Sequence, residues 1–377
     1  MISKGDKKLF LIDAYALIYR AYFAFAKNPR ITSKGVDTSA IYGFTNMLWD
    51  LINTENPNYL GVVFDTPQKT HRHIEYTDYK ANRDAMPEGI STAIPYIKNI
   101  LDAFNIPIIY LEGFEADDII GTLAKQADKE GFQTYMITPD KDFAQLVSRT
   151  TFMFRPGTRG NPNEIWDTNK VCEKFEINEV NQVIDFLGMV GDPVDNIPGI
   201  RGVGPKTASK LIQKYGSIES LYDSINELEG KLKQKVYDGK QDAFLSKKLA
   251  TIVVDAPIKL ASVSLKYDTP NLKELKEIFD ELEFTRIYDR ISKHHTYNAK
   301  NTSLDSEQLN LFTVDKKSTE DIMQRGKEIS KISDLKNIVS ELLLEPSISF
   351  FVFYENEIPL GISMLDSNSV VNYIFFS

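Results

Sequence analysis

Short apolar runs of the β type recur along the first part of the chain, and each is followed by a segment with helical periodicity. The runs are KLFLID, NYLGVVFD, IPIIYLEG and FQTYMITPD. Strands that alternate with helices predict an α/β fold with a central parallel sheet and helices on both faces. Ligands of such sheets bind beyond the carboxyl ends of the strands. All four runs lead directly into acidic residues there: Asp13, Asp65, Glu115, Asp117, Asp118, Asp140 and Asp142.

The acidic stretch EADD, with Glu115, Asp117 and Asp118, comes directly before an apolar helical segment. Helix capping is one explanation, because acidic residues in a first turn accept free N–H groups and complement the helix dipole. Two carboxylates about 4 Å apart repel by ~4 kcal/mol at an effective dielectric near 20, so a bound cation is the alternative. The stretch alone favours capping, but capping does not explain Asp13 and Asp65 at the ends of the first two strands.

Carboxylates without clustered histidine or cysteine are typical of sites for hard divalent cations such as Mg²⁺ or Mn²⁺. The four histidines fall in two pairs, His71 with His73 and His294 with His295, which we interpret as residues of polar loops. Two such ions about 4 Å apart can activate water and stabilise the leaving oxygen of a phosphate ester. The sequence therefore predicts phosphate chemistry with two or more Mg²⁺ or Mn²⁺ ions.

The segment GDPVDNIPGIRGVGPKTA follows a predicted amphipathic helix over residues 177–190 and carries Asp192 and Asp195. Its glycines are spaced as in a P-loop, but Pro205 stands where the P-loop lysine belongs. A hairpin between two helices fits better, because its backbone N–H groups can approach a phosphate. The next helix carries lysines at i, i+4 and i+8, which form either a track for a DNA backbone or a solvated face. The candidate DNA-binding residues are Gly199, Gly202, Gly204, Lys206, Thr207, Lys210 and Lys214.

A long connection over residues 66–92 has basic and aromatic side chains but little apolar periodicity. Long connections inside compact domains are usually functional, although an ordinary mobile surface loop is the alternative. Arg72, Lys80 and Arg83 are candidates for phosphate contacts. Tyr76 and Tyr79 are candidates for stacking on unpaired bases.

Composition limits the class of protein. A chain of 377 residues with 42% hydrophobic residues can fill more than one core, and its single cysteine, Cys172, suits a reducing cytoplasm. The formal charge of −9 argues mildly against a polyanionic partner unless the acids are gathered in a metal site. The early apolar segment is interrupted by Asp13 and Arg20, so we expect neither a membrane span nor a signal peptide.

Six motifs, LIDAYALIYRAYFAF, VVFD, YKANR, EGFEADD, TPDKDFAQL and GDPVDNIPGIRGVGPKTA, follow one another in order. In order and spacing they resemble the 5′ nuclease domain of bacterial DNA polymerase I, a member of the flap endonuclease family. The resemblance covers residues 1–290. It implies a parallel sheet under a helical arch, and a helix-hairpin-helix module that grips duplex DNA and often holds K⁺. It also implies domains over 1–175, with the arch at about 66–95, and over 176–290.

The resemblance further implies roles for single residues. Basic residues near the scissile phosphate would be Arg20, Lys80 and Arg83. The metal site would use Asp13, Asp65, Glu115, Asp117, Asp118, Asp140, Asp142, Asp192 and Asp195. The implied partners are DNA with a 5′ flap or a nick and the 5′ ends of RNA primers, bound by a cytoplasmic monomer that needs no obligate protein partner.

The remainder of the chain departs from the polymerase pattern. Residues 291–330 are polar and predict a linker, and residues 331–377 predict two or three antiparallel strands. The family's proofreading domain begins with a strand that bears an Asp-x-Glu metal pair, whereas SISFFVFYENE has no aspartate. We therefore expect a degenerate, incomplete 3′-5′ exonuclease-like segment and no polymerase activity.

Other functions remain as alternatives. A single-strand ribonuclease of the PIN type shares acids at strand ends but would not need a module that grips duplex DNA. A non-catalytic DNA junction-binding fragment would keep that module with vestigial acids. A haloacid dehalogenase-type phosphatase is not expected, because Tyr15 stands where its second aspartate belongs.

Overall fold

The computed structural model describes residues 7–157 and 161–295, and beyond them residue 339 and strands over 327–328, 350–355, 358–365 and 371–375. The chain divides into two compact units, Met1–Ser292 and Lys293–Ser377. Each of the two units contains one sheet. Within the part of the chain that is described, every helix is too short or too polar to cross a bilayer.

The first unit is built on a six-stranded sheet with the order β3-β2-β1-β4-β5-β6. Its first five strands are parallel and β6 is antiparallel. The bounds are β1 Lys7–Asp13, β2 Tyr59–Val63, β3 Ile108–Ile109, β4 Phe132–Ile137, β5 Thr151–Arg155 and β6 Glu164–Trp166. The predicted parallel sheet is confirmed, although the third strand has only two residues and the last two strands were not predicted.

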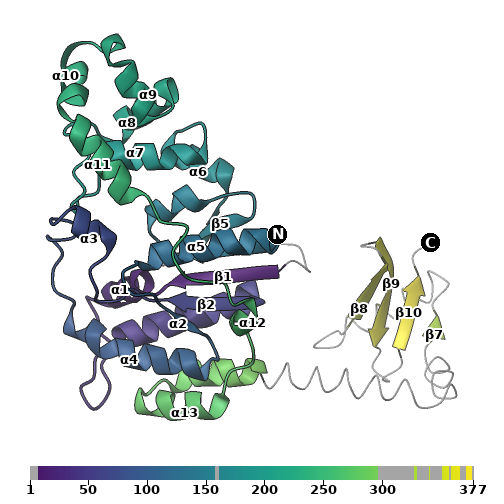
Figure 1. Ribbon diagram of the computed structural model, residues 1–377. Coiled ribbons are helices and arrows are strands. Elements are labelled where there is room, and N and C mark those ends of the chain that lie inside the picture. Colours follow the sequence, from purple (N-terminus) through teal and green to yellow (C-terminus); the bar gives the residue numbers. More distant parts are fainter. Residues whose placement is uncertain are drawn as a thin grey trace. The chain divides into compact units, whose positions relative to one another are not determined.

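Helices cover both faces of this sheet because its strands alternate between two apolar cores. Leu9 and Leu11 of β1 belong to one core, and Phe10 and Ile12 belong to the other. Figure 1 shows α5 on the opposite side of the sheet from α2 and α4. The helices around the sheet are α1 Ala14–Ala24, α2 Ser39–Glu55, α4 Glu88–Ala103, α5 Ala116–Lys129, α12 Ser262–Leu265 and α13 Leu272–Glu281.

A helical subdomain follows the sheet in sequence. Its elements are α6 Thr168–Phe175, η2 Val180–Gln182, α7 Val183–Val190, α8 Pro205–Tyr215, α9 Ile218–Asp223, η3 Ile225–Glu227, α10 Gly230–Asp238 and α11 Lys240–Ala250. The helix predicted over 177–190 was wrong at its start: it begins at Val183, because the backbone is extended at Glu179 and a short 3₁₀ turn follows. Gly216, at φ +84, ends α8 as its position predicted.

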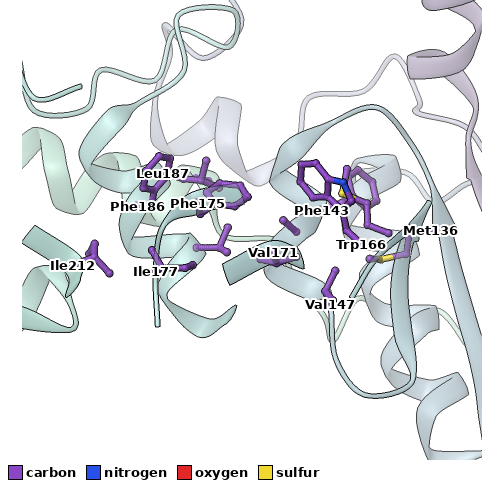
Figure 2. Close-up of a cluster of buried hydrophobic side chains, with 14 of the residues drawn as sticks. Met136, Phe143, Val147, Trp166, Val171, Phe175, Ile177, Phe186, Leu187 and Ile212 are labelled. Atoms are coloured by element: carbon purple, nitrogen blue, oxygen red, sulfur yellow. The ribbon is translucent and has the colours of Figure 1, made fainter. Parts of the chain in front are cut away.

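The sheet and the helical subdomain share one hydrophobic core. Figure 2 shows Met136 and Phe143, from the sheet side, in the same cluster as Phe186 and Leu187 of α7 and Ile212 of α8. All five of these side chains are buried. Because apolar burial contributes roughly 25 cal/mol per Å², this shared core holds the two parts together as one packed body.

The connection between β2 and α4 contains one short helix, α3 His71–Glu75. The prediction of a helical arch at about 66–95 is therefore wrong for residues 76–87, which form turns and extended chain. Lys80 adopts a left-handed φ of +57, which interrupts helical geometry, and Pro87 precedes α4.

The second unit contains a four-stranded sheet with the order β7-β10-β9-β8. Its strands are β7 Lys327–Glu328, β8 Phe350–Glu355, β9 Ile358–Leu365 and β10 Val371–Phe375. Strands β8, β9 and β10 pair antiparallel, which confirms the predicted strands. Most of the predicted linker at 291–330 lies outside the described residues.

Candidate active site

A cavity of about 1050 Å³ lies at the carboxyl edge of the first sheet. Strand ends of β1, β2 and β4, the N-terminus of α5, the β2–α4 connection and the α7–α8 connection all contribute to its wall. Seven of the nine predicted metal-site carboxylates line it: Asp13, Asp65, Glu115, Asp117, Asp140, Asp142 and Asp195. Acidic residues that are far apart in the sequence, from Asp13 to Asp195, therefore line the same cavity.

Asp13 ends β1 and caps α1. Its Oδ1 accepts the Ala16 N–H at 3.2 Å, and its Oδ2 accepts the Thr138 hydroxyl at 3.0 Å. Burial, together with the charge of Asp65, raises the pKa of Asp13 from 3.8 to about 7. Protein groups alone thus stabilise the charged form of this carboxylate poorly.

Asp65 lies two residues beyond β2 and reaches the start of α5. Its Oδ1 accepts the Ala116 N–H at 2.8 Å, so the second strand end is joined to the acidic helix N-terminus. Burial raises the pKa of Asp65, and that hydrogen bond and Lys80 oppose the shift. The ionised form of Asp65 is therefore also stabilised poorly by the protein, as is that of Asp13.

Helix capping accounts for part of the EADD stretch. Glu115 and Asp118 form a capping box at the start of α5, in which Asp118 Oδ2 accepts the Glu115 N–H at 3.2 Å. Glu115 also lines the cavity, as does Asp117. Burial raises the pKa of Asp117 well above its usual range. Burial also acts on Glu115, but Lys80 and Arg72 hold its pKa below the usual value.

The prediction that Asp118 is a metal ligand is not supported by its surroundings. Its side chain is fully buried, is paired with Arg72 at 2.8 Å and does not line the cavity. The prediction that Arg72 contacts a phosphate is not supported either, because its side chain is only 1% exposed and its guanidinium faces protein groups.

Asp140 and Asp142 follow β4 on the 3₁₀ helix η1, Lys141–Leu146. Asp140 caps η1 by accepting the Asp142 N–H at 3.0 Å. Burial raises the pKa of both carboxyls, and Asp140 raises that of Asp142 further. The Oδ1 atom of Asp142 is buried and has no hydrogen-bond donor among the residues that the structure describes. An orphaned buried carboxylate oxygen is a position that a cation can satisfy.

The donor set fits a hard divalent cation, since carboxylates are the most numerous charged groups on the cavity wall. The side chains do not already close on one point: in residues 7–157 and 161–295, no three His, Cys, Asp or Glu side chains form a ready-made metal cage. Magnesium usually takes few protein carboxylates and keeps several waters, so a loose set of acids suits it. Metal binding itself stays a prediction.

Asp192 and Asp195 lie on the tight loop between α7 and α8. Asp192 and Ile197 form an antiparallel bridge across it. The loop closes through Gly191 and Gly199, at φ +70 and +61, where an added Cβ would lie 2.5 Å from backbone atoms. This closure directs Asp195 into the cavity. Asp192 does not line the cavity and pairs with Lys141 at 3.5 Å, so its assignment to the metal site is not supported.

Lys80 and Arg83 bring positive charge to the acids. The Lys80 Nζ lies 2.9 Å from Glu115 Oε1, and the guanidinium of Arg83 donates to Asp195 Oδ1, from Nε at 3.1 Å and also from Nη2. Asn82 and Asn196 join the connection to the loop through the carbonyls of Pro193 and Asp78, at 2.7 and 2.8 Å. The connection is therefore docked on the loop that carries Asp195.

Three other predicted contacts differ from the expectation. Tyr79 lines the cavity but is only 4% exposed, and its hydroxyl donates to Glu115 Oε2 at 3.1 Å, so its ring is not available for stacking. Tyr76 is partly buried beside it. Arg20 does not line the cavity; it lines a separate pocket of about 460 Å³ and donates to the Gly157 carbonyl. Its expected place beside the scissile phosphate is not supported.

Aromatic residues of α1 were missed by the sequence reasoning. Tyr15, Tyr19 and Phe23 line one wall of the cavity. Their i, i+4, i+8 spacing directly after Asp13 is a helical stripe that could have been found in the sequence.

The predicted hairpin connects α7 and α8. Gly202 adopts φ +80 and Gly204 precedes α8, and both are exposed. Gly199 is buried and donates its N–H to Ser246 Oγ at 2.8 Å, so its predicted phosphate contact is not supported. The structure adds Lys235, whose Nζ donates to the Gly202 carbonyl at 3.1 Å. No local sequence signal indicates this contact, because the two residues lie 33 positions apart.

The predicted lysine stripe lies on the outside of α8. Lys206, Lys210 and Lys214 are all exposed, while Thr207 is half-buried and donates its N–H to the Gly204 carbonyl at 3.0 Å. Lys214 also pairs with Glu227 at 3.2 Å, an exposed pair of small energetic value. The stripe is thus placed where a DNA backbone could reach it, and binding stays a prediction.

Comparisons with known proteins agree with this geometry. Residues 8–176 match the family described as 5′-3′ exonuclease, N-terminal resolvase-like domain, and residues 178–273 match 5′-3′ exonuclease, C-terminal SAM fold. The 5′-3′ exonuclease of Aquifex aeolicus is 40% identical over 287 residues, which are 76% of this chain and 96% of that protein. DNA polymerase I of Caldicellulosiruptor bescii is 38% identical over 93% of this chain, which spans only 40% of that relative.

A solved structure shares the fold. The flap endonuclease of bacteriophage T5, crystallised as a pseudo-enzyme-product complex with DNA and metal ions, matches with a TM-score of 0.54 and 22% identity. The match covers 73% of this chain and 99% of the bacteriophage protein. From the two consecutive domain matches and the relative matched over almost its whole length, the chain belongs to the 5′-3′ exonuclease family.

Proposed function

We propose that this chain is a divalent-metal-dependent, structure-specific 5′ nuclease. It hydrolyses phosphodiester bonds near the junction of duplex DNA with a 5′ single-stranded flap or nick. The observation that carries the proposal is the gathering of seven of the nine predicted carboxylates on one cavity, where one oxygen of Asp142 has no donor among the described residues. Family membership supports the reaction class, hydrolysis of nucleic acid from a 5′ end, and the carboxylates of the cavity support the dependence on a divalent metal.

The residues that would hold Mg²⁺ or Mn²⁺ are Asp13, Asp65, Glu115, Asp117, Asp140, Asp142 and Asp195. Bound there, two or more such ions would supply an activated water and neutralise the charge of the phosphate. The protein's own contribution is electrostatic. Lys80 and Arg83 bring two cationic groups to the cavity wall, where they can stabilise charge that develops on the phosphate.

DNA binding is supported by the exposed face of α8. Lys206 and Lys210 form a basic strip beside the hairpin, and Lys235 adds an ammonium at Gly202. Such contacts position a duplex without reading its sequence. The exposed backbone around Gly202 and Gly204 would hold the proposed K⁺, which would add positive charge for a DNA phosphate.

The aromatic wall of α1 suits the single-stranded part of such a substrate. Tyr15, Tyr19 and Phe23 offer apolar faces inside the cavity, and unpaired bases stack on aromatic side chains irrespective of their identity. This wall would accept a displaced strand near the carboxylates.

In its cellular context we propose that the chain acts as the 5′ nuclease part of a DNA polymerase I. It would remove RNA primers from lagging-strand fragments and excise damaged 5′ ends, as a monomer in the cytoplasm. The similarity to polymerase I of C. bescii over 93% of this chain supports that context. Activities of the full-length relatives beyond the matched region are not proposed for this chain.

A 5′-labelled flap duplex tests the proposal. The protein is incubated with it in Mg²⁺, in Mn²⁺ and in excess chelator, beside a single-stranded RNA of the same length. We expect short 5′ products from the flap with either metal, none with chelator, and little cutting of the RNA. Flap binding without cutting at any metal concentration would favour the non-catalytic junction-binding alternative, and preferential cutting of the RNA would favour a PIN-type ribonuclease.

A further inference from the structure

The guanidinium of Arg72 has no hydrogen-bonding capacity left for a substrate. An arginine carries five N–H donors. Arg72 Nε donates to the Leu249 carbonyl at 2.9 Å, and Nη1 donates to Asp118 Oδ2 at 2.8 Å and Glu115 Oε2 at 3.3 Å. Nη2 donates to Asp118 Oδ1 at 2.8 Å and to the Thr251 carbonyl at 3.0 Å. All five donors are therefore used inside the protein.

Asp118 is saturated in the same way. An ionised carboxylate has about four lone-pair positions. Oδ2 accepts from Arg72 and from the Glu115 N–H at 3.2 Å, and Oδ1 accepts from Arg72 and from the Val253 N–H at 2.9 Å. A bidentate pair of this kind is strong and fixes orientation, and both side chains are at most 1% exposed. Asp118 thus has no free oxygen position for a metal.

The pair joins three segments that are distant in the sequence. Arg72 belongs to α3, Asp118 to α5, and the carbonyls of Leu249 and Thr251 lie at the end of α11 and just beyond it. A second ion pair, Lys248 with Glu75 at 2.9 Å, joins α3 to α11 at the surface. The base of the β2–α4 connection is therefore fixed both to the acidic helix N-terminus and to the end of the helical subdomain.

Two cavity carboxylates receive their orientation from this arrangement. Glu115 has its backbone N–H bound by Asp118 and its Oε2 by Arg72. Asp117 Oδ1 accepts the Asp118 N–H at 2.7 Å, and its Oδ2 lies 3.8 Å from Arg72 Nη2. Both side chains face the cavity, whereas Arg72 and Asp118 do not.

We propose that Arg72 and Asp118 form a buried positioning pair that orients Glu115 and Asp117 toward the cavity, without contacting metal or DNA themselves. The inference rests on the proposed function, because the benefit of that orientation is metal binding. Groups that orient metal ligands typically change metal affinity by 10- to 100-fold when they are replaced.

The test measures Mn²⁺ binding to the full 377-residue chain, without DNA, by isothermal titration calorimetry. Arg72→Lys keeps the positive charge but cannot donate two parallel hydrogen bonds to the carboxylate of Asp118. Asp118→Asn keeps the shape of the side chain but removes its negative charge. We expect each variant to weaken Mn²⁺ binding by about 10- to 100-fold at a temperature where circular dichroism shows a folded protein. The double variant should bind Mn²⁺ as tightly as the single variant with the lower affinity, because the two residues act as one unit.

The control variant is Arg286→Lys, an exposed arginine that does not line the cavity, which should bind Mn²⁺ like the unmodified protein. Should Arg72→Lys not fold, Asp118→Asn decides the question. Unchanged Mn²⁺ affinity in Asp118→Asn, or additive losses in the double variant, would overturn the positioning pair. An unmodified protein that binds no Mn²⁺ would instead overturn the proposed function.

A second readout separates positioning from a direct phosphate contact. Binding of flap DNA is measured at several salt concentrations in chelator, where no cutting occurs. Removing one cation that neutralises a phosphate reduces the slope of log affinity against log salt by about one. We expect the slope for the double variant Arg72→Gln/Asp118→Asn, which removes the cation together with its buried carboxylate partner, to match that of the unmodified protein. A slope reduced by about one in this double variant would show that Arg72 acts on DNA and would contradict the inference.

Discussion

Replacing Asp13 by asparagine should stabilise the metal-free protein at neutral and alkaline pH. Burial and Asp65 raise the pKa of Asp13 from 3.8 to about 7 in the folded state. Because the folded form holds its proton more tightly than the unfolded chain, ionisation of Asp13 opposes folding as the pH rises through this range. The opposing free energy is fully present above pH 7 and absent below about pH 4. With about 1.4 kcal/mol for each pKa unit, its upper limit is about 4 kcal/mol.

Asparagine is a suitable probe because the local hydrogen bonds of Asp13 survive the change. Its side-chain oxygen can still accept the Ala16 N–H that caps α1, and its amide can donate to the hydroxyl of Thr138. Packing around the side chain is therefore kept, and the charge is the main difference. The control is Asp102→Asn, on the exposed side of α4, where a change within about 0.5 kcal/mol is expected.

Urea unfolding followed by circular dichroism, in chelator at pH 8 and pH 5, measures the effect. We expect Asp13→Asn to raise the free energy of unfolding by several kcal/mol at pH 8 and by clearly less at pH 5. An equal gain at both pH values would refute the electrostatic reasoning. A loss of stability at pH 8 would refute it too, since the hydrogen bonds of Asp13 would then outweigh its charge.

Three further predictions concern the site and the hairpin. Asp142→Ala should abolish cutting of a labelled flap while its binding in chelator stays close to normal, because the orphaned oxygen belongs to the proposed metal site; full activity would exclude that role. Replacing Lys206 and Lys210 by glutamine should weaken flap binding and lower its salt slope by roughly one for each phosphate that is no longer neutralised, as measured by fluorescence anisotropy; an unchanged slope would mean a merely solvated face. Gly199→Ala should lower the free energy of unfolding, measured by thermal unfolding, by more than about 2 kcal/mol. Gly199 has a φ of +61, and an added Cβ would lie 2.5 Å from the Val190 backbone. The control Gly204→Ala should change the free energy of unfolding little, because nothing lies within 4 Å of an added Cβ there.

The sheet edge was predictable because its signal is local. Each apolar run ends in an acidic residue, and parallel topology brings the carboxyl ends of the strands together without further information. Asp13, Asp65 and Asp140 illustrate this: each stands at the end of its own strand or within three residues beyond it, and all three line the cavity. Strands β5 and β6 were missed, although β5 carries an apolar and aromatic run, TFMFR, typical of a strand.

The buried ion pairs could not be predicted, because they depend on contacts between distant segments. Arg72 looks like any basic residue of a polar loop, yet its partners Asp118 and Leu249 lie 46 and 177 positions away. The same applies to Tyr79, whose hydroxyl binds Glu115. Which acids of EADD face the cavity and which one is buried against Arg72 is decided by this tertiary packing and by no property of the residues alone.

The hydrophobic core that sheet and helices share bears on where the proposed nuclease would cut. Since Phe143 beside the acids and Ile212 beneath the basic stripe belong to one continuous cluster, tight packing fixes the distance between the carboxylate cavity and the proposed duplex-binding stripe. If both sites act as proposed, we expect the cut to fall a constant number of nucleotides from the junction. Substitutions of core residues between the cavity and the basic stripe should therefore make the position of the cut more variable before they lower metal binding or DNA binding.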